Sequence, residues 1–465
     1  MMSREGLFQQ RTDVVKSLYK DRKVTVVTIG LGRIGLPTAA MFAASGARVI
    51  GVDIDPDVIL NVNEGRCKFI DEPGLDKILE RPVKEGQLRA TADYDSAVPQ
   101  ADFVIVCVPT PVDYEKTPDY SAVISVCRKI GKLLKPGSTV IIESTVGPGT
   151  VENLIRPILE SESGMRAGSD FGLASCPERS DPGNIVSNMK TVPRVVGGIN
   201  QHCTEIVADL YETLLGVKVY RVSDPKTANA VKLTENLFRD VNIALANEFA
   251  LVYEKLGIDA IEVINACASK YNFMPHFPGA GVGGPCLPSN SYYLISEGVK
   301  AGNIPYLVRA AREVNDRMPE HVVQLVSEAL NEVGKTIRGS KIAILGVSYK
   351  PQIKDVQLTP VEPICNNLSR LGAMLDIYDP MFAGETVFGY PVRRSLAQAV
   401  NGADCIVIGT AHREFVETEL KLMAQLAESP AALVDSRNVV NPRDALAAGF
   451  MFRGVGRRSS FPPNQ

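Results

Sequence analysis

The chain has 465 residues, of which 45% are hydrophobic and 22% are charged, a balance typical of a globular protein with several apolar cores. This length predicts two or three domains rather than one. The formal net charge of −3 comes without a basic block, so we expect no nucleic-acid partner, although a few local cations can still bind an anionic small molecule.

The nine cysteines are scattered along the chain, and no two of them form a Cys-x-x-Cys pair. This pattern indicates neither a disulfide framework nor a zinc site, so we expect no metal ion and a reducing, cytoplasmic setting. The N-terminus lacks the apolar core of a secretory signal, and no apolar run reaches the length of a membrane span. Residues 1–21 show a loose helical pattern, which predicts either a helical arm that contacts a partner or a solvated tail.

Residues 24–53 show the complete order of a dinucleotide-binding unit. A buried strand at 24–29 leads into Gly30-Leu-Gly32-Arg-Ile-Gly35, a small-residue helix follows at 38–45, and a strand at 48–52 ends in Asp53. The first glycine makes the turn, the second lets a pyrophosphate approach the helix N-terminus, and the third lets helix and strand pack closely. The carboxylate of Asp53 suits ribose hydroxyls and repels a 2′-phosphate, so the motif predicts a Rossmann fold that binds NAD rather than NADP.

Polar clusters follow the next three predicted strands, at 102–108, 139–143 and 171–175. Thr110, Thr145 and Glu178 with Arg179 stand in these clusters. The carboxyl ends of strands form the ligand-binding edge of an open α/β sheet, so these side chains are candidates for the nicotinamide side of the site. Ordinary loop chemistry is the alternative explanation.

A helical pattern without glycine runs from Pro225 to Leu256. A helix of this length bridges domains or forms a dimer core, so we expect a homodimer or a higher homo-oligomer. Lys232 and Asn236 are four residues apart and share one face, and Arg239 lies close to it. The alternative is a solvated polar stripe. Further helices are predicted at 259–266, 306–317 and 320–333.

The stretch Gly279–Leu294 contains four glycines in six residues, followed at once by Cys286. Glycines allow bends that a Cβ would forbid and let the backbone pass close to a ligand. A thiol held in such a frame is a candidate covalent nucleophile. The alternative is a glycine-rich turn with a packed cysteine, because free cysteine is usually a small inert hydrophobe.

A second β/α alternation starts at residue 341, with strands predicted at 341–346, 374–378, 405–408 and 432–434. It lacks a Gly-x-Gly-x-x-Gly motif, so no second dinucleotide is implied. Lys350 and Arg437 are available for the phosphates or base of a nucleotide. The predicted fold is α/β, with two Rossmann-like doubly wound domains, at 22–222 and 336–456, joined by a central helical region at 223–335; residues 457–465 are expected to be a tail.

These residues resemble the nucleotide-sugar 6-dehydrogenases of the UDP-glucose/GDP-mannose dehydrogenase family, over residues 22–456. The resemblance rests on GLGRIGLP at 30–37, VPTP at 108–111, STV at 144–146, CPER at 176–179, KLTENLFRDVNIA at 232–244 and GVGGPCLP at 281–288. Their combination looks most like the branch that acts on UDP-N-acetylmannosamine or UDP-N-acetylglucosamine.

The resemblance implies an NAD-dependent four-electron oxidation of the sugar's C6 hydroxyl to a uronate, for polysaccharide or glycan biosynthesis. It implies that Cys286 forms a thiohemiacetal and then a thioester, and that Lys232 and Asn236 stabilise the oxyanion. Thr145 and Glu178 would position a water, with Glu178 a possible general base. The resemblance adds further binding positions: Arg33, Ile34 and Thr110 for NAD, and Arg179, Arg239, Gly283, Lys350 and Arg437 for the UDP-sugar.

The chain departs from the family pattern four residues after the cysteine, where Asn290 replaces the usual aspartate. An amide cannot act as a base and carries no charge to activate a water. Ser289 stands where some members have lysine, and Gln357 where arginine is common. These changes leave open how the thioester is hydrolysed and which sugar is bound.

Three alternatives remain from sequence. The first is a UDP-glucose 6-dehydrogenase. The second is a two-electron hydroxyacid dehydrogenase, in which Lys232 and Asn236 are catalytic and Cys286 is incidental. The third is a regulator that binds NAD or a nucleotide sugar without turnover.

Overall fold

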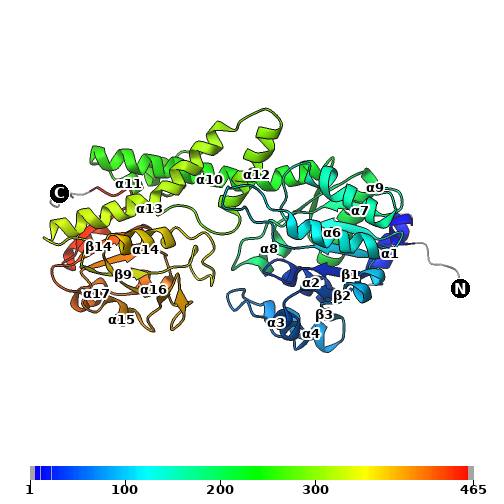
Figure 1. Ribbon diagram of the computed structural model, residues 1–465, viewed down its shortest axis with the longest axis horizontal. Coiled ribbons are helices and arrows are strands. Elements are labelled where there is room, and N and C mark those ends of the chain that lie inside the picture. Colours follow the sequence, from blue (N-terminus) through cyan, green and yellow to red (C-terminus); the bar gives the residue numbers. More distant parts are fainter. Residues whose placement is uncertain (1–5, 11, 22, 459–465) are drawn as a thin grey trace. The chain divides into compact units, whose positions relative to one another are not determined.

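The computed structural model describes residues 6–10, 12–21 and 23–458. The chain forms two compact units, the first made of Met1–Glu235 and Tyr292–Asn303 and the second of Asn236–Ser291 and Ile304–Gln465. The backbone therefore passes from one unit to the other three times. Figure 1 shows that each unit contains a sheet with helices beside it.

The first unit contains an eight-stranded sheet in the order β3-β2-β1-β4-β5-β6-β7-β8. All neighbours are parallel except β6 and β7. Chain order reverses at β1, which pairs with both β2 and β4, as in a Rossmann fold. The strands are β1 Thr25–Ile29, β2 Arg48–Val52, β3 Leu88–Thr91, β4 Phe103–Val106, β5 Thr139–Ile142, β6 Gly172–Ser175, β7 Arg194–Gly198 and β8 Val219–Arg221.

Two hydrophobic layers cover the two faces of this sheet. Successive residues of a strand point to opposite faces, so Val26 belongs to one layer and Val27 to the other. The longer helices supply the rest of both layers, and α1 adds the fully buried Val15 and Tyr19, so this part of the expected arm or tail belongs to the core. The helices are α1 Thr12–Lys20, α2 Gly35–Ala44, α3 Pro56–Asn63, α4 Leu75–Lys84, α5 Tyr94–Ala97, α6 Ser121–Leu133, α7 Arg156–Ser163, α8 Ile185–Thr191 and α9 Gln201–Leu210.

The second unit contains a parallel five-stranded sheet in the order β10-β9-β13-β14-β15 and a short β11–β12 hairpin. It confirms the second β/α alternation. The strands are β9 Lys341–Leu345, β10 Met374–Tyr378, β11 Thr386–Val387, β12 Tyr390–Pro391, β13 Cys405–Ile408, β14 Ala432–Asp435 and β15 Met451–Gly454. The helices are α11 Ala260–Cys267, α13 Tyr306–Glu332, α14 Val361–Arg370, α15 Leu396–Val400, α16 Arg413–Glu417, α17 Leu420–Leu426 and α18 Pro442–Ala447.

Two helices carry the chain across the division between the units. Helix α10 spans Pro225–Leu256, as the sequence predicts, and α12 spans Leu287–Lys300. The predicted break near residue 318 is wrong, because α13 continues through Pro319 as one helix. Proline lacks an N–H, so it leaves the carbonyl four residues earlier, that of Asn315, without its helical partner.

The second unit repeats the strand–turn–strand–acid order of the first, with a different outcome. Asp379 follows β10 as Asp53 follows β2, but Asp379 is fully buried. Its Oδ2 accepts hydrogen bonds from the N–H groups of Val347 and Ser348, at 2.8 and 3.1 Å, and contacts His412 Nε2 at 3.0 Å. This carboxylate is fully engaged by the protein, so it cannot receive a ribose.

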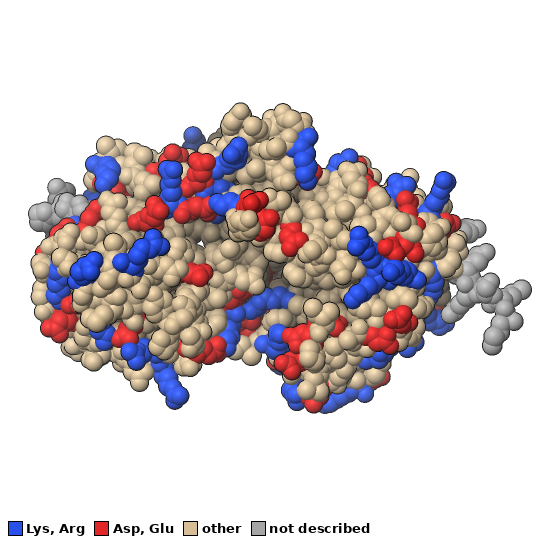
Figure 2. Space-filling view, in the orientation of Figure 1, with Lys and Arg blue, Asp and Glu red and all other residues tan. Residues whose placement is uncertain are grey.

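Acidic and basic side chains are interspersed over the visible face of each unit, in keeping with the small net charge (Figure 2). Within the described ranges, no helix combines the length and the apolar character needed to cross a membrane.

Candidate active site

The turn between β1 and α2, residues 30–35, is named here the cofactor turn. Gly30 has φ +87°, a value that favours glycine, and a Cβ on Gly35 would lie 1.7 Å from the Gly30 carbonyl oxygen. A Cβ on Gly32, in contrast, would meet no atom within 4 Å. Helix α2 begins without a side-chain cap at Ile34. The turn thus leaves room beside an uncapped helix N-terminus, which fits a pyrophosphate.

Two charged residues flank the cofactor turn. Asp53 accepts the Leu31 N–H at 2.6 Å and the Asp55 N–H at 3.0 Å, which orients its carboxylate at the end of β2. The guanidinium of Arg33 instead pairs with Asp71, at 2.9 Å, and lies over the ring of Phe69. The position of Asp53 fits ribose binding, while the Arg33 side chain is committed to the protein.

Thr110 and Thr145 join the loops that follow β4 and β5. The Thr110 hydroxyl donates to the Thr145 carbonyl at 2.7 Å, and the hydroxyl of Tyr293 donates to the Thr110 carbonyl. These predicted residues therefore lie together at the carboxyl edge of the sheet, and the bonds hold the two loops in one place.

Glu178, in the loop after β6, is held in a buried charge cluster. Its Oε1 accepts from the N–H groups of Arg179 and Ser180, at 2.7 and 2.6 Å, and from the Ser180 hydroxyl. Its Oε2 accepts from Nη1 of Arg194, which is 2% exposed. Burial alone would raise the pKa of the Glu178 carboxyl, but the Arg194 guanidinium and the Ser180 bonds lower it below its ordinary value.

A second buried carboxylate, Glu143, completes this cluster. It accepts from the Tyr211 hydroxyl at 2.5 Å and the Thr38 hydroxyl at 3.1 Å, and lies 3.8 Å from Arg194 Nη1. Burial raises the pKa of Glu143, against the opposing effect of Arg194. The cluster links the first turns of α2, through Thr38, to Glu178.

Lys232 lies on α10 in the first unit and is only 7% exposed. Within the described ranges, its ammonium makes no hydrogen bond and no ion pair. Its charge nevertheless contributes to the lowered pKa of Glu178, so the two groups share one electrostatic environment. Arg179 is different, because its guanidinium pairs with Glu235 and donates to the Pro193 carbonyl.

In the second unit, Cys286 is exposed and immediately precedes the first residue of α12. A thiolate at this position faces the positive end of the helix dipole. One turn further, Asn290 donates its N–H to the Cys286 carbonyl at 2.9 Å and is 2% exposed. The Asn290 Oδ1 accepts from Nδ2 of Asn236 at 2.6 Å, so the structure links the backbone of Cys286, Asn290 and Asn236.

Residues 279–286, named here the glycine loop, also lie against predicted nucleotide-binding residues. Arg437 Nη1 is 3.5 Å from the place a Gly279 Cβ would take, and a Cβ on Gly283 would lie 2.8 Å from the Leu358 carbonyl oxygen. Burial lowers the pKa of Arg437, and within the described ranges its guanidinium forms no ion pair. Lys350 is half-buried in the loop after β9, and Arg239 is exposed on α10.

The structure divides the predicted residues between the units. Those for the cofactor, with Glu178, Arg179 and Lys232, belong to the first unit, and the remainder belong to the second. Sequence analysis missed Arg194 and Glu143. The available signal was weak. Arg194 begins the otherwise apolar strand β7, and Glu143 directly follows the apolar strand β5.

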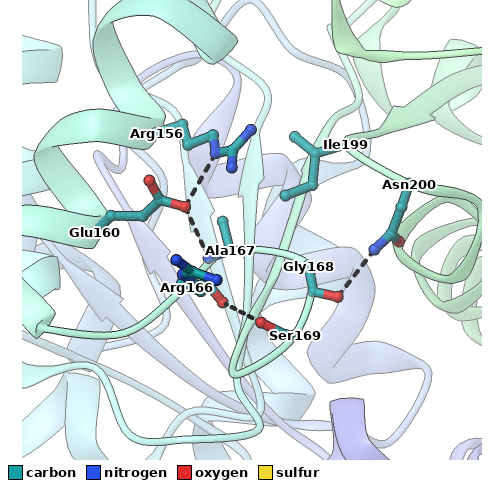
Figure 3. A pocket seen from close by; sticks show the side chains of 8 residues that line it. All are labelled: Arg156, Glu160, Arg166, Ala167, Gly168, Ser169, Ile199 and Asn200. Atoms are coloured by element: carbon teal, nitrogen blue, oxygen red, sulfur yellow. Dashed lines mark hydrogen bonds and ion pairs between the residues drawn. The ribbon is translucent and has the colours of Figure 1, made fainter.

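A cavity of about 490 Å³ in the first unit contains none of the predicted residues (Figure 3). It lies beside the segment that connects α7 to β6. Arg156 there pairs with Glu160 at 3.0 Å. The residues that line it are Arg156, Glu160, Arg166, Ala167, Gly168, Ser169, Ile199 and Asn200.

The sheet order, the open cofactor turn and the orientation of Asp53 define a Rossmann-type dinucleotide-binding protein. Three models of the UDP-glucose/GDP-mannose dehydrogenase family match it: the NAD binding domain at residues 23–215, the central domain at 226–317 and the UDP binding domain at 343–442. The chain belongs to the UDP-glucose/GDP-mannose dehydrogenase family. It is an NAD-dependent nucleotide-sugar dehydrogenase, which confirms the predicted class of enzyme and its cofactor.

Several relatives match over nearly their whole length. The chain is 36% identical to a UDP-N-acetyl-D-mannosamine dehydrogenase of Pyrococcus horikoshii, over 93% of this chain and 99% of that protein. It is 32% identical to a UDP-N-acetyl-D-glucosamine 6-dehydrogenase of Pseudomonas aeruginosa, over 91% and 98%. A solved UDP-D-ManNAc dehydrogenase from Pyrococcus horikoshii superimposes with a TM-score of 0.87 at 35% identity, over 94% of this chain and all of that one.

Proposed function

We propose that this enzyme oxidises the C6 hydroxyl of a UDP-N-acetylhexosamine, UDP-ManNAc or UDP-GlcNAc, to the uronate, for polysaccharide or glycan biosynthesis. The observation that carries the proposal is the exposed Cys286, at the start of α12 and at the end of a glycine loop that begins near Arg437. A plain alcohol dehydrogenation needs no nucleophile, whereas oxidation to an acid does. The names of the relatives support an N-acetylhexosamine.

In the proposed reaction, loss of a hydride and a proton from the C6 carbinol gives an aldehyde. The Cys286 sulfur adds to the aldehyde carbon, so a C–S bond forms and the carbonyl oxygen becomes an oxyanion. Loss of a second hydride leaves a thioester. Water then attacks the thioester, the C–S bond breaks, the thiolate leaves and the carboxylate is released. The cofactor turn and Asp53 would hold NAD, which would supply the hydride acceptor for each oxidation.

Lys232 and Asn236 are proposed to stabilise the oxyanion, one by charge and the other by an amide N–H. Lys232 supports this role because it is almost buried and its ammonium, in the described part of the chain, is not neutralised by an ion pair. A cation that is already in place when charge develops stabilises the transition state without reorganisation. Arg437 and Lys350 are proposed to hold the UDP part.

Glu178 and Thr145 are proposed to position the hydrolytic water. The lowered pKa of Glu178 keeps this carboxylate ionised but makes it a weak base, and its two oxygens already accept hydrogen bonds. These features support Glu178 as an orienting anion beside Lys232 more than as the group that removes a proton. Glu178 is therefore not proposed as the proton acceptor for hydrolysis, and the amide of Asn290 cannot act as that base either.

The test is NADH production from UDP-ManNAc, UDP-GlcNAc, UDP-glucose and GDP-mannose, with uronate quantified in the same reactions. We expect two NADH per uronate, with a UDP-N-acetylhexosamine as the best substrate. One NADH per product indicates the two-electron alternative, and UDP-glucose as the best substrate rejects the proposed sugar. Wild-type uronate formation by Cys286→Ser rejects the covalent mechanism.

We also propose that two copies associate through α10. Phe238, Leu245, Val252 and Leu256 are 44% to 64% exposed, and their spacing of seven and four residues places them on one face of the helix. We name these four residues the apolar stripe. A row of exposed apolar side chains on one helix face is typical of an interface.

The nine free cysteines support a reducing, cytoplasmic setting.

A further inference from the structure

The glycine loop begins at a buried hydrogen bond from its own backbone. The N–H of Gly279 donates to Oδ1 of Asn247 on α10 at 2.9 Å. Nδ2 of Asn247 in turn donates to Oδ1 of Asn315 on α13, also at 2.9 Å. Both asparagines are at most 1% exposed. We name Asn247 and Asn315 the amide relay.

The amide relay ends at a buried carboxylate. Nδ2 of Asn315 donates to Asp240 at 2.8 Å, and Arg312 donates to the same oxygen at 2.7 Å. A backbone N–H at one end can only donate and an ionised carboxylate at the other can only accept. The orientation of both amides is therefore fixed, because turning either one would set two donors or two acceptors against each other.

The same carboxylate also holds the chain on the other side of the thiol. The hydroxyl of Ser291 donates to Asp240 Oδ2 at 2.8 Å, five residues after Cys286. Gly279 lies seven residues before Cys286. Each flank of the nucleophile thus has one link to Asp240, direct at Ser291 and through the amide relay at Gly279, beside the backbone bonds that Ala280 and Gly284 donate to Ser436 and Gln357.

A backbone feature of α13 adds to this attachment. The carbonyl of Asn315, which Pro319 leaves without its helical partner, lies where a Cβ on Gly281 would approach it to 2.8 Å. Gly281 also has φ +119°, which side chains rarely adopt. The middle of the loop therefore closes against the same turn of α13 that carries the amide relay.

We propose that Asn247 and Asn315 are positioning residues for Cys286: they transmit the fixed position of Asp240 to the glycine loop and so set the place of the thiol. This role rests on the proposed function of Cys286. Buried polar networks are rigid only when every member is satisfied, so removal of one amide frees the start of the loop at Gly279, while the backbone bonds of Ala280 and Gly284 still tether it. A small displacement of a reacting group can cost on the order of a hundredfold in rate.

The experiment compares Asn247→Ala, Asn315→Ala and the double variant with wild type, at a temperature where each is folded. We expect each single variant to lower kcat at least about tenfold, with NAD affinity within about twofold of wild type. The double variant should lose no more kcat than the more impaired of the two single variants, because both residues belong to one chain of hydrogen bonds. Losses that multiply, or a kcat within about twofold of wild type for Asn247→Ala, overturn the proposal.

A second readout needs no substrate. Iodoacetamide labelling, followed by peptide mapping, gives the alkylation rate of Cys286 relative to Cys267, which is also exposed in the same unit. We expect this ratio to fall at least about threefold in Asn247→Ala, because the thiolate loses its alignment with the α12 N-terminus. A ratio equal to that of wild type overturns the proposal.

Ser340→Ala is the matched control, because the side chain of Ser340 is buried and its partly buried hydrogen bond to the Thr336 carbonyl lies elsewhere in the same unit. It should change neither the ratio nor kcat. Asn247→Ser supplies a shorter acceptor if Asn247→Ala does not fold. If Cys286→Ser keeps wild-type activity while the labelling ratio still falls in Asn247→Ala, the covalent mechanism is wrong and the relay stands.

Discussion

Arg194 is the buried cation on which the ionised state of Glu178 depends. It lies between Glu178 and Glu143, with 2% of its surface exposed. Removal of one partner from a buried charge cluster leaves uncompensated charge, which costs more than the intact cluster contributes. At the scale of single residues, the ionised state of Glu178 therefore depends on a residue that the sequence analysis did not name.

We predict that Arg194→Met lowers the free energy of unfolding by about 3–5 kcal/mol at pH 7. The lowered pKa of Glu178 in wild type means that its contribution to stability is present above the unfolded pKa, near 4.5, and is lost as the pH falls through the folded pKa. In the variant, burial raises the pKa of both carboxyls, so their protonation relieves the penalty in acid. The difference in the free energy of unfolding between wild type and Arg194→Met should therefore shrink towards pH 4.5.

Urea unfolding at pH 7 and at pH 4.5 measures this difference. Arg156→Met is the control, because Arg156 is exposed and forms an i,i+4 pair with Glu160, which is worth about 0.5 kcal/mol at most. A penalty for Arg194→Met that is the same at both pH values would contradict the assignment of the two carboxylates.

Asn290→Asp is predicted to speed thioester hydrolysis. The residue is already held by Asn236 through one oxygen, and aspartate retains that acceptor. The second oxygen would then offer a charge and a base where the amide has a donor. Single-turnover measurements of uronate release after the second NADH should show the acceleration. An unchanged rate would show that the base lies elsewhere.

At the scale of elements, strands were predictable where the sequence shows a run of apolar or β-branched residues, as β1 and β4 do. Burial alone was not enough, because every residue of β7 is buried. The sequence analysis predicted no strand at β7 or β8. β7 begins with Arg194 and ends with two glycines, and β8 has three residues, two of them exposed. Neither has the apolar run that identifies a buried strand.

Candidate site residues were identifiable from sequence where one short motif carries them, but their structural partners from distant segments were not. Cys286, Lys232 and Glu178 stand in recognisable short motifs. Arg194 approaches Glu178 from β7, which runs antiparallel to the strand before Glu178. Asn247 and Asn315 are 68 residues apart, and only the packing of α10 against α13 reveals the pair.

Helix α10 yields a prediction about assembly. Leu245→Glu places a charge in the centre of the apolar stripe, so we expect it to weaken self-association by about tenfold or more in Kd. Lys255→Glu, an exposed change on the same helix but outside the stripe, is the control. Sedimentation equilibrium measures both. If the two variants associate alike, the stripe is not the interface.

At the scale of the whole molecule, the two units share a strand–turn–strand–acid order. Only the first unit has an acidic residue and an open turn that fit a dinucleotide. In the described ranges, the carboxylate of Asp379 is occupied by the protein, whereas Asp53 borders an open turn. Calorimetric titration should therefore find one NAD per chain. Two equivalents would contradict this reading of Asp379.

Gly32→Val is the matched variant for that titration. The position has open space and no positive φ, so we expect the melting temperature to stay within a few degrees of wild type while the side chain fills the place of the pyrophosphate. NAD binding should be lost. Retention of wild-type affinity would place the cofactor elsewhere.

The single cofactor turn has a consequence for timing. Two oxidations are proposed for each sugar, so the turn at Gly30 must be emptied and refilled once before the product is complete. During that interval the half-oxidised sugar would be a reactive aldehyde, free to diffuse away and damage other molecules. In the proposed mechanism, the bond to Cys286 would also retain the sugar on the enzyme, provided that the thiohemiacetal outlasts one exchange of cofactor.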